Sequence, residues 1–324
     1  MKAVVLYKTG IPEVLSISEV PIPIVNPGWV LVKVKAFGIN RSELIMRQVE
    51  GDAPYIHLPR IIGIECAGEV ADQSDSGLRK GQKVIALMGG MGRTFDGSYA
   101  EYVLVPATHV FTVNANLDWD ELGAIPESYF TAYGSLFDCL QIKSGETLLI
   151  RGGTSAMGLA SIQLAKAVGA TVLASTRKEC KRKFLLSQGA DHVLIDNGSL
   201  SGQLYRLYPR GVNKILELIG PSTLSESLKL VRYHGIVCST GVLGSKSTLN
   251  GFDPIKDIPN GVYLTGFYSN FPSQAVINSI FNLIETNHLH PVISNVYPLD
   301  KIVQAHSLAE NNEVNGKIVI RIYE

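Results

Sequence analysis

The sequence has no net charge, few cysteines and no long apolar run. Lysine plus arginine and aspartate plus glutamate each number 29 in a chain of 324 residues, so no charge excess attracts nucleic acid or an anionic membrane. No apolar run approaches the length of about 18 residues that a membrane span needs, and Met1–Tyr7 becomes polar too early for a signal peptide. The four cysteines follow no pairing motif, which is typical of reduced thiols. We therefore expect a cytoplasmic protein that binds neither nucleic acid nor membranes.

Two kinds of apolar spacing divide the chain. The first 120 or so residues alternate short apolar stretches with turns rich in proline and glycine, which indicates β-strands. From Leu122 onward, helical and strand patterns alternate, which favours an α/β fold with a parallel sheet. A late strand, Ile318–Ile322, is expected to return to the first domain. The sequence thus predicts a β-rich domain of residues 1–121 and 272–324 and a doubly wound parallel-sheet domain of residues 122–271.

The expected elements can be assigned to residue ranges. The β-rich part is predicted to hold strands at Met1–Tyr7, Leu15–Val20, Val30–Ala36, Gly68–Ala71, Lys83–Leu87 and Tyr99–Val105. The parallel sheet is predicted from Thr147–Ile150, Thr171–Ala174, Val193–Ile195, Ile215–Leu218, Ile236–Ser239 and Val262–Phe267. Helices are expected at Leu159–Val168, Leu200–Leu207, Leu224–Arg232, Gln274–Thr286 and Leu299–Ala309.

A glycine-rich turn joins the first strand of the parallel sheet to the helix that follows. It reads Gly152, Gly153, Thr154, Ser155, Ala156, Met157 and Gly158. Strand, glycine-rich turn, helix and strand form the unit that holds a dinucleotide pyrophosphate, because glycine admits the phosphates and the helix start supplies free N–H groups. Ser155 stands where the middle glycine of a G-x-x-G-x-x-G turn is expected. A plain strand-to-helix connection is the alternative, but the strand–helix units on both sides favour a dinucleotide site.

The end of the next strand indicates which dinucleotide binds. An NAD site places an acidic residue there to bind the ribose 2′-hydroxyl. This chain has Ser175, Thr176 and Arg177, with Lys181 one turn later. Hydroxyls and cations suit a 2′-phosphate, so NADPH is expected over NADH. The alternative is an exposed basic helix start.

Several motifs resemble the medium-chain dehydrogenase/reductases over essentially the whole chain. They are Gly38–Glu43, Leu58–Val70, Lys80–Val84, Gly97–Tyr102 and Tyr129–Tyr133, in order and with the expected spacing. The resemblance is closest to the zinc-independent branch, the NADPH:quinone oxidoreductases and enoyl reductases. It implies a GroES-like catalytic domain followed by a Rossmann domain, and a homodimer through the Rossmann sheet edges.

The zinc-ligand positions of the related alcohol dehydrogenases are altered. Those enzymes carry a zinc-binding cysteine just after the Gly-x-Asn segment and a zinc-binding histidine between glycine and glutamate. Here the first region is Asn40–Glu43 and the histidine position is Ile64, and asparagine, arginine and isoleucine do not supply the ligands zinc prefers. No cysteine lies between Cys66 and Cys139, so the four-cysteine structural zinc lobe is missing. The pair His288 and His290 lacks a third ligand, and we predict no metal.

The resemblance also implies roles for particular residues. It suggests Asn40, Thr131 and the loop that includes Gly241 and Val242 near the nicotinamide, and Asn315 with Lys317 in a tail motif that closes over the cofactor. Tyr55, Tyr129 and Tyr133 are candidate proton donors, since a phenol can protonate an enolate or hydroquinone oxygen. The catalytic residues predicted are Asn40, Tyr55, Tyr129 and Thr131.

These features predict a zinc-free, NADPH-dependent oxidoreductase that transfers hydride to quinones or to activated double bonds, with a small quinone or enone as its substrate. Such acceptors are already electron-poor, so orientation and exclusion of water are the main tasks left to the protein. The alternative is a non-catalytic NADPH-binding redox sensor or structural protein on the same fold.

Overall fold

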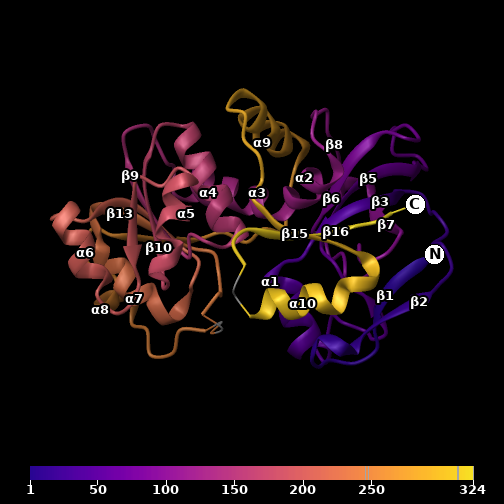
Figure 1. Cartoon of the computed structure of the whole chain (residues 1–324), viewed down its shortest axis with the longest axis horizontal. Coiled ribbons are helices and arrows are strands. Elements are labelled where there is room, and N and C mark those ends of the chain that lie inside the picture. The colour runs from indigo at the N-terminus through magenta and orange to yellow at the C-terminus, as the bar shows by residue number, and fades with distance from the viewer. Residues whose placement is uncertain (245, 247, 312–313, 324) are drawn as a thin grey trace. The chain divides into compact units, whose positions relative to one another are not determined.

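The computed structural model describes residues 1–244, 246, 248–311 and 314–323 and separates the chain into two compact units (Figure 1). Unit 1 comprises Met1–Phe130 and Ser269–Glu324, and unit 2 comprises Thr131–Tyr268. The domain boundaries predicted after residues 121 and 271 stay a prediction. Within the described ranges, no helix has the length and apolar character that a membrane crossing requires.

Unit 2 is built on a six-stranded parallel sheet in the order β11-β10-β9-β12-β13-β14. Its strands are β9 (Thr147–Arg151), β10 (Thr171–Thr176), β11 (His192–Ile195), β12 (Val212–Glu217), β13 (Val231–Ser239) and β14 (Tyr263–Gly266). Leu148, Leu149 and Ile150 in β9 are fully buried, as expected for a central strand covered on both faces. The strand order reverses between β9 and β12, and sheets of this kind bind ligands at the carboxyl ends of the strands beside such a reversal.

Helices cover both faces of this sheet. They are α4 (Ala156–Ala167), η5 (Glu179–Lys181), α5 (Arg182–Ser187), α6 (Leu200–Leu207), α7 (Pro221–Leu230) and α8 (Pro254–Asp257). Figure 1 shows α4 and α5 on one side of the strands and α6 and α7 on the other. Before β9 run α3 (Pro126–Tyr133), which crosses the border between the units, and the π-helical turn η4 (Gly134–Cys139).

Unit 1 contains a three-stranded antiparallel sheet in the order β2-β1-β4 and a seven-stranded sheet in the order β15-β16-β3-β5-β6-β8, with β7 also paired to β3. The strands are β1 (Lys2–Leu6), β2 (Leu15–Glu19), β3 (Trp29–Gly38), β4 (Arg60–Ile61), β5 (Glu65–Asp72), β6 (Lys83–Leu87), β7 (Tyr102–Pro106), β8 (Val110–Thr112), β15 (Ile293–Pro298) and β16 (Lys317–Arg321). The helical segments are η1 (Pro12–Val14), α1 (Arg41–Ile45), η2 (Met46–Glu50), η3 (Ala107–His109), α2 (Trp119–Ala124), α9 (Gln274–Thr286), η6 (Leu299–Lys301) and α10 (Ile302–Glu310). Strand β16 pairs with β3, Val319 opposite Gly38, which confirms that the tail strand returns to the first domain.

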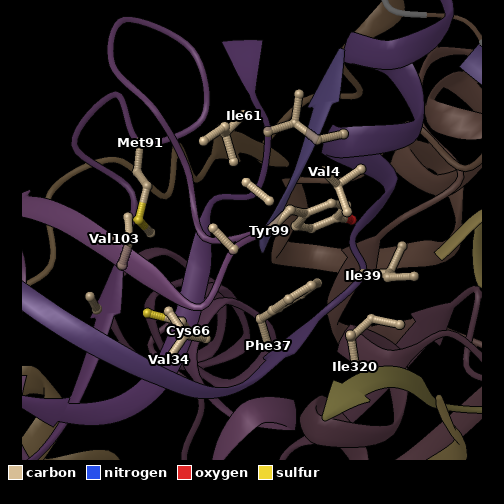
Figure 2. Packing of buried hydrophobic residues seen from close by; sticks show 14 of the residues in the cluster. Val4, Val34, Phe37, Ile39, Ile61, Cys66, Met91, Tyr99, Val103 and Ile320 are labelled. Carbon is tan, nitrogen blue, oxygen red and sulfur yellow. The ribbon is translucent and has the colours of Figure 1, made fainter. Parts of the chain in front are cut away.

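The core of unit 1 surrounds two stacked aromatic rings. Phe37 and Tyr99 lie with ring centroids 4.4 Å apart, and Figure 2 shows Val4, Ile39 and Ile320 beside them. The Tyr99 hydroxyl pairs with Nε2 of buried His306 at 3.0 Å, so the polar end of the ring is satisfied inside an apolar core. Both units have the architecture expected from the sequence: a GroES-like β-rich domain and a Rossmann parallel-sheet domain.

Candidate functional site

The glycine-rich turn of unit 2 begins where β9 ends and is closed by the side chain of Ser155. Ser155 is the N-cap of α4: its Oγ accepts a hydrogen bond from the Gly158 N–H at 3.0 Å and donates one to the Gly152 carbonyl at 2.8 Å. The serine at the middle-glycine position therefore fixes the turn and the start of the helix. Gly152 has a φ of +91°, which favours glycine, and a Cβ at Gly158 would lie 2.5 Å from the Gly152 carbonyl oxygen.

Two neighbouring loops lie against this turn. A Cβ built on Gly152 would lie 3.0 Å from Cδ1 of Leu243 and 3.3 Å from Cβ of Leu218. The Leu243 N–H also donates to the Leu218 carbonyl at 3.0 Å. A Cβ on Gly241 would collide with the Leu218 backbone, so this position requires glycine. The structure thus brings the predicted loop of Gly241 and Val242 together with the turn at the carboxyl ends of three strands.

The predicted 2′-phosphate residues lie at the end of β10 and just after it. The Ser175 carbonyl accepts a hydrogen bond from the Gly153 N–H at 3.0 Å, which joins this strand end to the turn. Ser175 and Thr176 are buried, whereas Arg177 is exposed and Lys181 is half-buried in η5. These positions therefore lie at one strand end, and their binding of a 2′-phosphate stays a prediction.

The charged residues next to these positions form ion pairs with cations or acids nearby. The Arg182 guanidinium, one residue after Lys181, is held by Glu179. Asp196, which follows β11, bonds Arg151 at 2.7 Å. Two carboxylates near the strand ends therefore already carry cationic partners.

A buried arginine lies directly before the turn. Arg151 is fully buried, and its guanidinium reaches Asp196, Glu226 at 2.9 Å and Glu217 at 3.8 Å. Glu217 is also fully buried, and its Oε1 accepts the N–H groups of Ile219 at 2.8 Å and Gly220 at 3.1 Å. This ion-pair network therefore holds the loop that packs against Gly152.

Unit 1 contains a second buried network, centred on Asn40. The Lys317 ammonium donates to Asn40 Oδ1 at 2.5 Å and to Ser128 Oγ at 3.0 Å, and it pairs with Glu65 Oε1 at 2.6 Å. Asn40 Nδ2 in turn donates to Glu65 Oε1 at 2.8 Å. Glu65 has no exposed surface and Lys317 is 2% exposed, so the amide of Asn40 is fixed by two buried charges of opposite sign.

Glu43 joins this network to the segment before β5. Its Oε2 accepts the Asn40 N–H at 3.0 Å and its Oε1 accepts the Ile64 N–H at 3.1 Å. Burial raises the pKa of Glu43 most, and the negative charge of Glu65 adds to this, so that the pKa is about 7. A carboxyl group that titrates near neutral pH thus supports the backbone on which Asn40 lies.

The other predicted catalytic and tail residues have different surroundings. Tyr129 is buried, and burial raises its phenol pKa above the ordinary value, so the hydroxyl stays protonated at neutral pH. Thr131 is buried as well, whereas Tyr55 is 49% exposed. Tyr133 packs on Phe137, with ring centroids 4.6 Å apart.

The two residues of the predicted tail motif also differ. Oδ1 of Asn315 is shielded from solvent and has no hydrogen-bond partner within the described ranges. The Lys317 ammonium is used by the network around Asn40. Cofactor contact by Lys317 stays a prediction.

The sequence reading missed Glu43, Glu65, Ser128 and Arg151. The signal available in the sequence was a charged residue next to an apolar strand. Glu65 is the first residue of buried strand β5, and Arg151 is the last residue of buried strand β9. No group of three or more His, Cys, Asp or Glu side chains in the described part of the chain is arranged to hold a metal ion.

Comparison with known proteins matches this architecture. Residues 26–115 match the alcohol dehydrogenase GroES-like domain, and residues 156–284 match the family described as zinc-binding dehydrogenase. The human quinone oxidoreductase is 30% identical over 329 aligned positions, which cover 99% of this chain and 97% of the human protein. A solved NAD-dependent alcohol dehydrogenase is 26% identical with a TM-score of 0.89, and both chains are covered completely.

A solved quinone oxidoreductase from Coxiella burnetii has the same fold. It is 24% identical with a TM-score of 0.87, covering 100% of this chain and 99% of its own. With its GroES-like and Rossmann units and its full-length similarity to the human enzyme, the chain belongs to the medium-chain dehydrogenase/reductase family, as a quinone oxidoreductase-like member.

Proposed function

We propose that the chain is a cytoplasmic, NADPH-dependent and zinc-free oxidoreductase that transfers hydride to quinones or to α,β-unsaturated carbonyl compounds. Full-length similarity to the human quinone oxidoreductase supports the reaction class. The observation that carries the zinc-free assignment is the set of contacts of Asn40, whose amide is bonded to Lys317 and Glu65.

The residues of unit 2 fit a dinucleotide. Gly152 and Gly158 let the turn pack closely on itself and on the neighbouring loops, and α4 starts there with the positive end of its dipole. We assign the pyrophosphate to residues 152–158 and the adenosine 2′-phosphate to Ser175, Thr176, Arg177 and Lys181. The shielded Oδ1 of Asn315 has no hydrogen-bond partner among the residues that the structure describes, which supports its assignment to the cofactor.

A catalytic zinc ion does not suit the region of Asn40. Ile64 has no ligating atom, and Asn40 Oδ1 already accepts a hydrogen bond from an ammonium group. The same ammonium is 2.6 Å from Glu65, so a divalent cation placed there would be opposed by a buried positive charge.

In the proposed mechanism the protein orients the reactants and supplies a proton. Bound NADPH supplies the hydride. Asn40 is held in one orientation by Lys317 and Glu65, and we assign it to positioning at the reacting end of the site. We assign the phenol of Tyr129 as proton donor to the oxygen of the reduced product, with Tyr55 as the exposed alternative and Thr131 as a further hydroxyl.

We also propose a homodimer through the edge of the parallel sheet. Strand β14 is an edge strand, Tyr263 on it is 54% exposed, and Tyr233 on the neighbouring strand β13 is 67% exposed. An edge strand with exposed aromatic side chains is suited to pairing with a second copy. Light scattering across a concentration series tests this assignment, and a monomer at all concentrations would contradict it.

The function is tested by following NADPH oxidation with 1,4-benzoquinone, 9,10-phenanthrenequinone, a simple enone and a short aldehyde. A chelator is added to half of the reactions, and NADH is run in parallel. We expect chelator-resistant turnover of a quinone or enone with NADPH. Chelator-sensitive aldehyde turnover would overturn the zinc-free assignment, and NADPH binding without any turnover would indicate the non-catalytic sensor instead.

A further inference from the structure

One face of the π-helical turn η4 contacts the ends of the last two strands in unit 2. Ser135 Oγ is 3.0 Å from Thr240 Oγ1, just past the end of β13. Cys139, about one turn later in η4, directs its thiol at the Gly266 carbonyl, the last residue of β14, at 3.5 Å. The Leu140 N–H bonds the Ser135 carbonyl at 2.9 Å, which closes the wide turn and holds both side chains on the same face.

Cys238 lies between these two contacts. It is the penultimate residue of β13, and its Sγ is 3.2 Å from the same Thr240 Oγ1 that Ser135 contacts. In the pairing of β13 with β14, the next residue, Ser239, lies opposite Gly266, which the Cys139 thiol contacts. Two independent contacts from η4 therefore bracket Cys238 and bring the Cys139 thiol to its side.

The two thiols differ in their exposure to solvent. Cys238 is completely buried, whereas Cys139 is half-buried. Burial, and to a smaller extent the neighbouring Cys139, raise the pKa of the Cys238 thiol to about 12. A small oxidant therefore reaches Cys139 first, and Cys238 is the protected partner.

We propose that Cys139 and Cys238 form a redox-active dithiol that peroxides convert to an intramolecular disulfide. In the first step the Cys139 sulfur attacks one peroxide oxygen and the O–O bond breaks, giving a sulfenic acid and one water molecule. In the second step the Cys238 sulfur attacks the Cys139 sulfur, the S–OH bond breaks, and the thiol proton leaves with the hydroxyl as a second water molecule. The two thiols lose two electrons and the peroxide gains them.

A disulfide between Cys139 and Cys238 would affect the loop next to the glycine-rich turn. Cys238 and Thr240 lie just before the loop that packs against the glycine-rich turn. A disulfide would replace the contact of Cys238 with Thr240 and attach η4 to the end of β13. Reduction by a dithiol reagent restores the starting state.

The test uses the full-length protein with Cys180→Ser, because Cys180 is exposed and would react on its own. Hydrogen peroxide is added and the intact mass is measured by mass spectrometry; the remaining thiols are then blocked and cross-linked peptides are identified. We expect a mass lower by about 2 Da, a linked peptide pair containing both residues, and reversal by dithiothreitol. Since the thiolate of Cys238 is the attacking form, we expect faster closure at higher pH.

Two variants provide the controls. With Cys238→Ala, Cys139 is expected to gain oxygen instead of losing hydrogen, because no second thiol traps the sulfenic acid. With Cys139→Ser, buried Cys238 is expected to stay a free thiol. Oxygen addition at Cys139 in the Cys180→Ser protein, with Cys238 still free and no linked peptide, would overturn the proposal. The linked peptide is sought in protein with both cysteines present, so the outcome does not depend on the stability of either variant.

Discussion

Replacing Lys317 by methionine tests whether the buried ion pair organises the region of Asn40. Glu65 has no exposed surface, and the substitution removes its cation at 2.6 Å while leaving the N–H donors of Asn40 at 2.8 Å and Glu127 at 2.6 Å. Removing one partner of a buried pair leaves an uncompensated charge and costs about 3–5 kcal/mol. We expect Lys317→Met to lower the free energy of unfolding of unit 1 by this amount.

The assay is urea unfolding followed by tryptophan fluorescence, because Trp29 and Trp119 both belong to unit 1. The matched control is Lys35→Met, since Lys35 pairs with the half-exposed Glu69 at 3.5 Å and a surface pair contributes about 0–1 kcal/mol.

The double variant Lys317→Met with Glu65→Gln removes both charges. We expect it to lose less stability than the sum of the two single variants, by at least about 1 kcal/mol. Additive losses, or a loss from Lys317→Met no larger than that from Lys35→Met, would refute the reasoning.

Three further expectations follow from the same structure. Glu43 has a pKa of about 7 in the folded protein against an ordinary value of 4.5, so its contribution to the free energy of unfolding is present below pH 4.5 and is lost as pH rises through 7. Glu43→Gln should therefore flatten the curve of stability against pH in this range, and an unchanged slope would contradict this. Burial lowers the pKa of His306 to about 3 from 6.5, so stability should fall as pH drops from 6.5 towards 3, by up to about 1.4 kcal/mol per pH unit, and His306→Gln should remove that slope in acid unfolding. Arg177→Ala with Lys181→Ala should raise the KM for NADPH about tenfold or more and leave the KM for NADH nearly unchanged, since a charge-assisted contact contributes about 1.5–3 kcal/mol; equal effects on both cofactors would exclude the 2′-phosphate assignment.

The strands and helices were largely predictable because their signals are local. The expected strand Lys83–Leu87 and the helices Leu200–Leu207 and Gln274–Thr286 agree residue for residue with β6, α6 and α9. The prediction for β5 began three residues late, since Glu65 in that strand was interpreted only as part of a motif. Spacing of apolar side chains and glycine turns depends on neighbours along the chain, and a sequence displays these directly.

The glycine-rich turn was only partly predictable. The sequence showed Ser155 as a departure from the glycine pattern. The structure shows the same side chain bonding Gly152 and Gly158 and so capping the helix. A side-chain cap depends on the backbone geometry of the turn, which residue types alone do not specify.

The sequence by itself determined the fold class, the position of the glycine-rich turn and the altered residues at the zinc-ligand positions. Only the tertiary structure decided which buried charges face each other. Lys317 reaches Asn40 across 277 residues of sequence, and Arg151 joins Asp196, just after β11, to Glu217, the last residue of β12. Such pairs form because the completed sheets close the chain and exclude water, and a buried charge must then find a partner wherever the fold brings one.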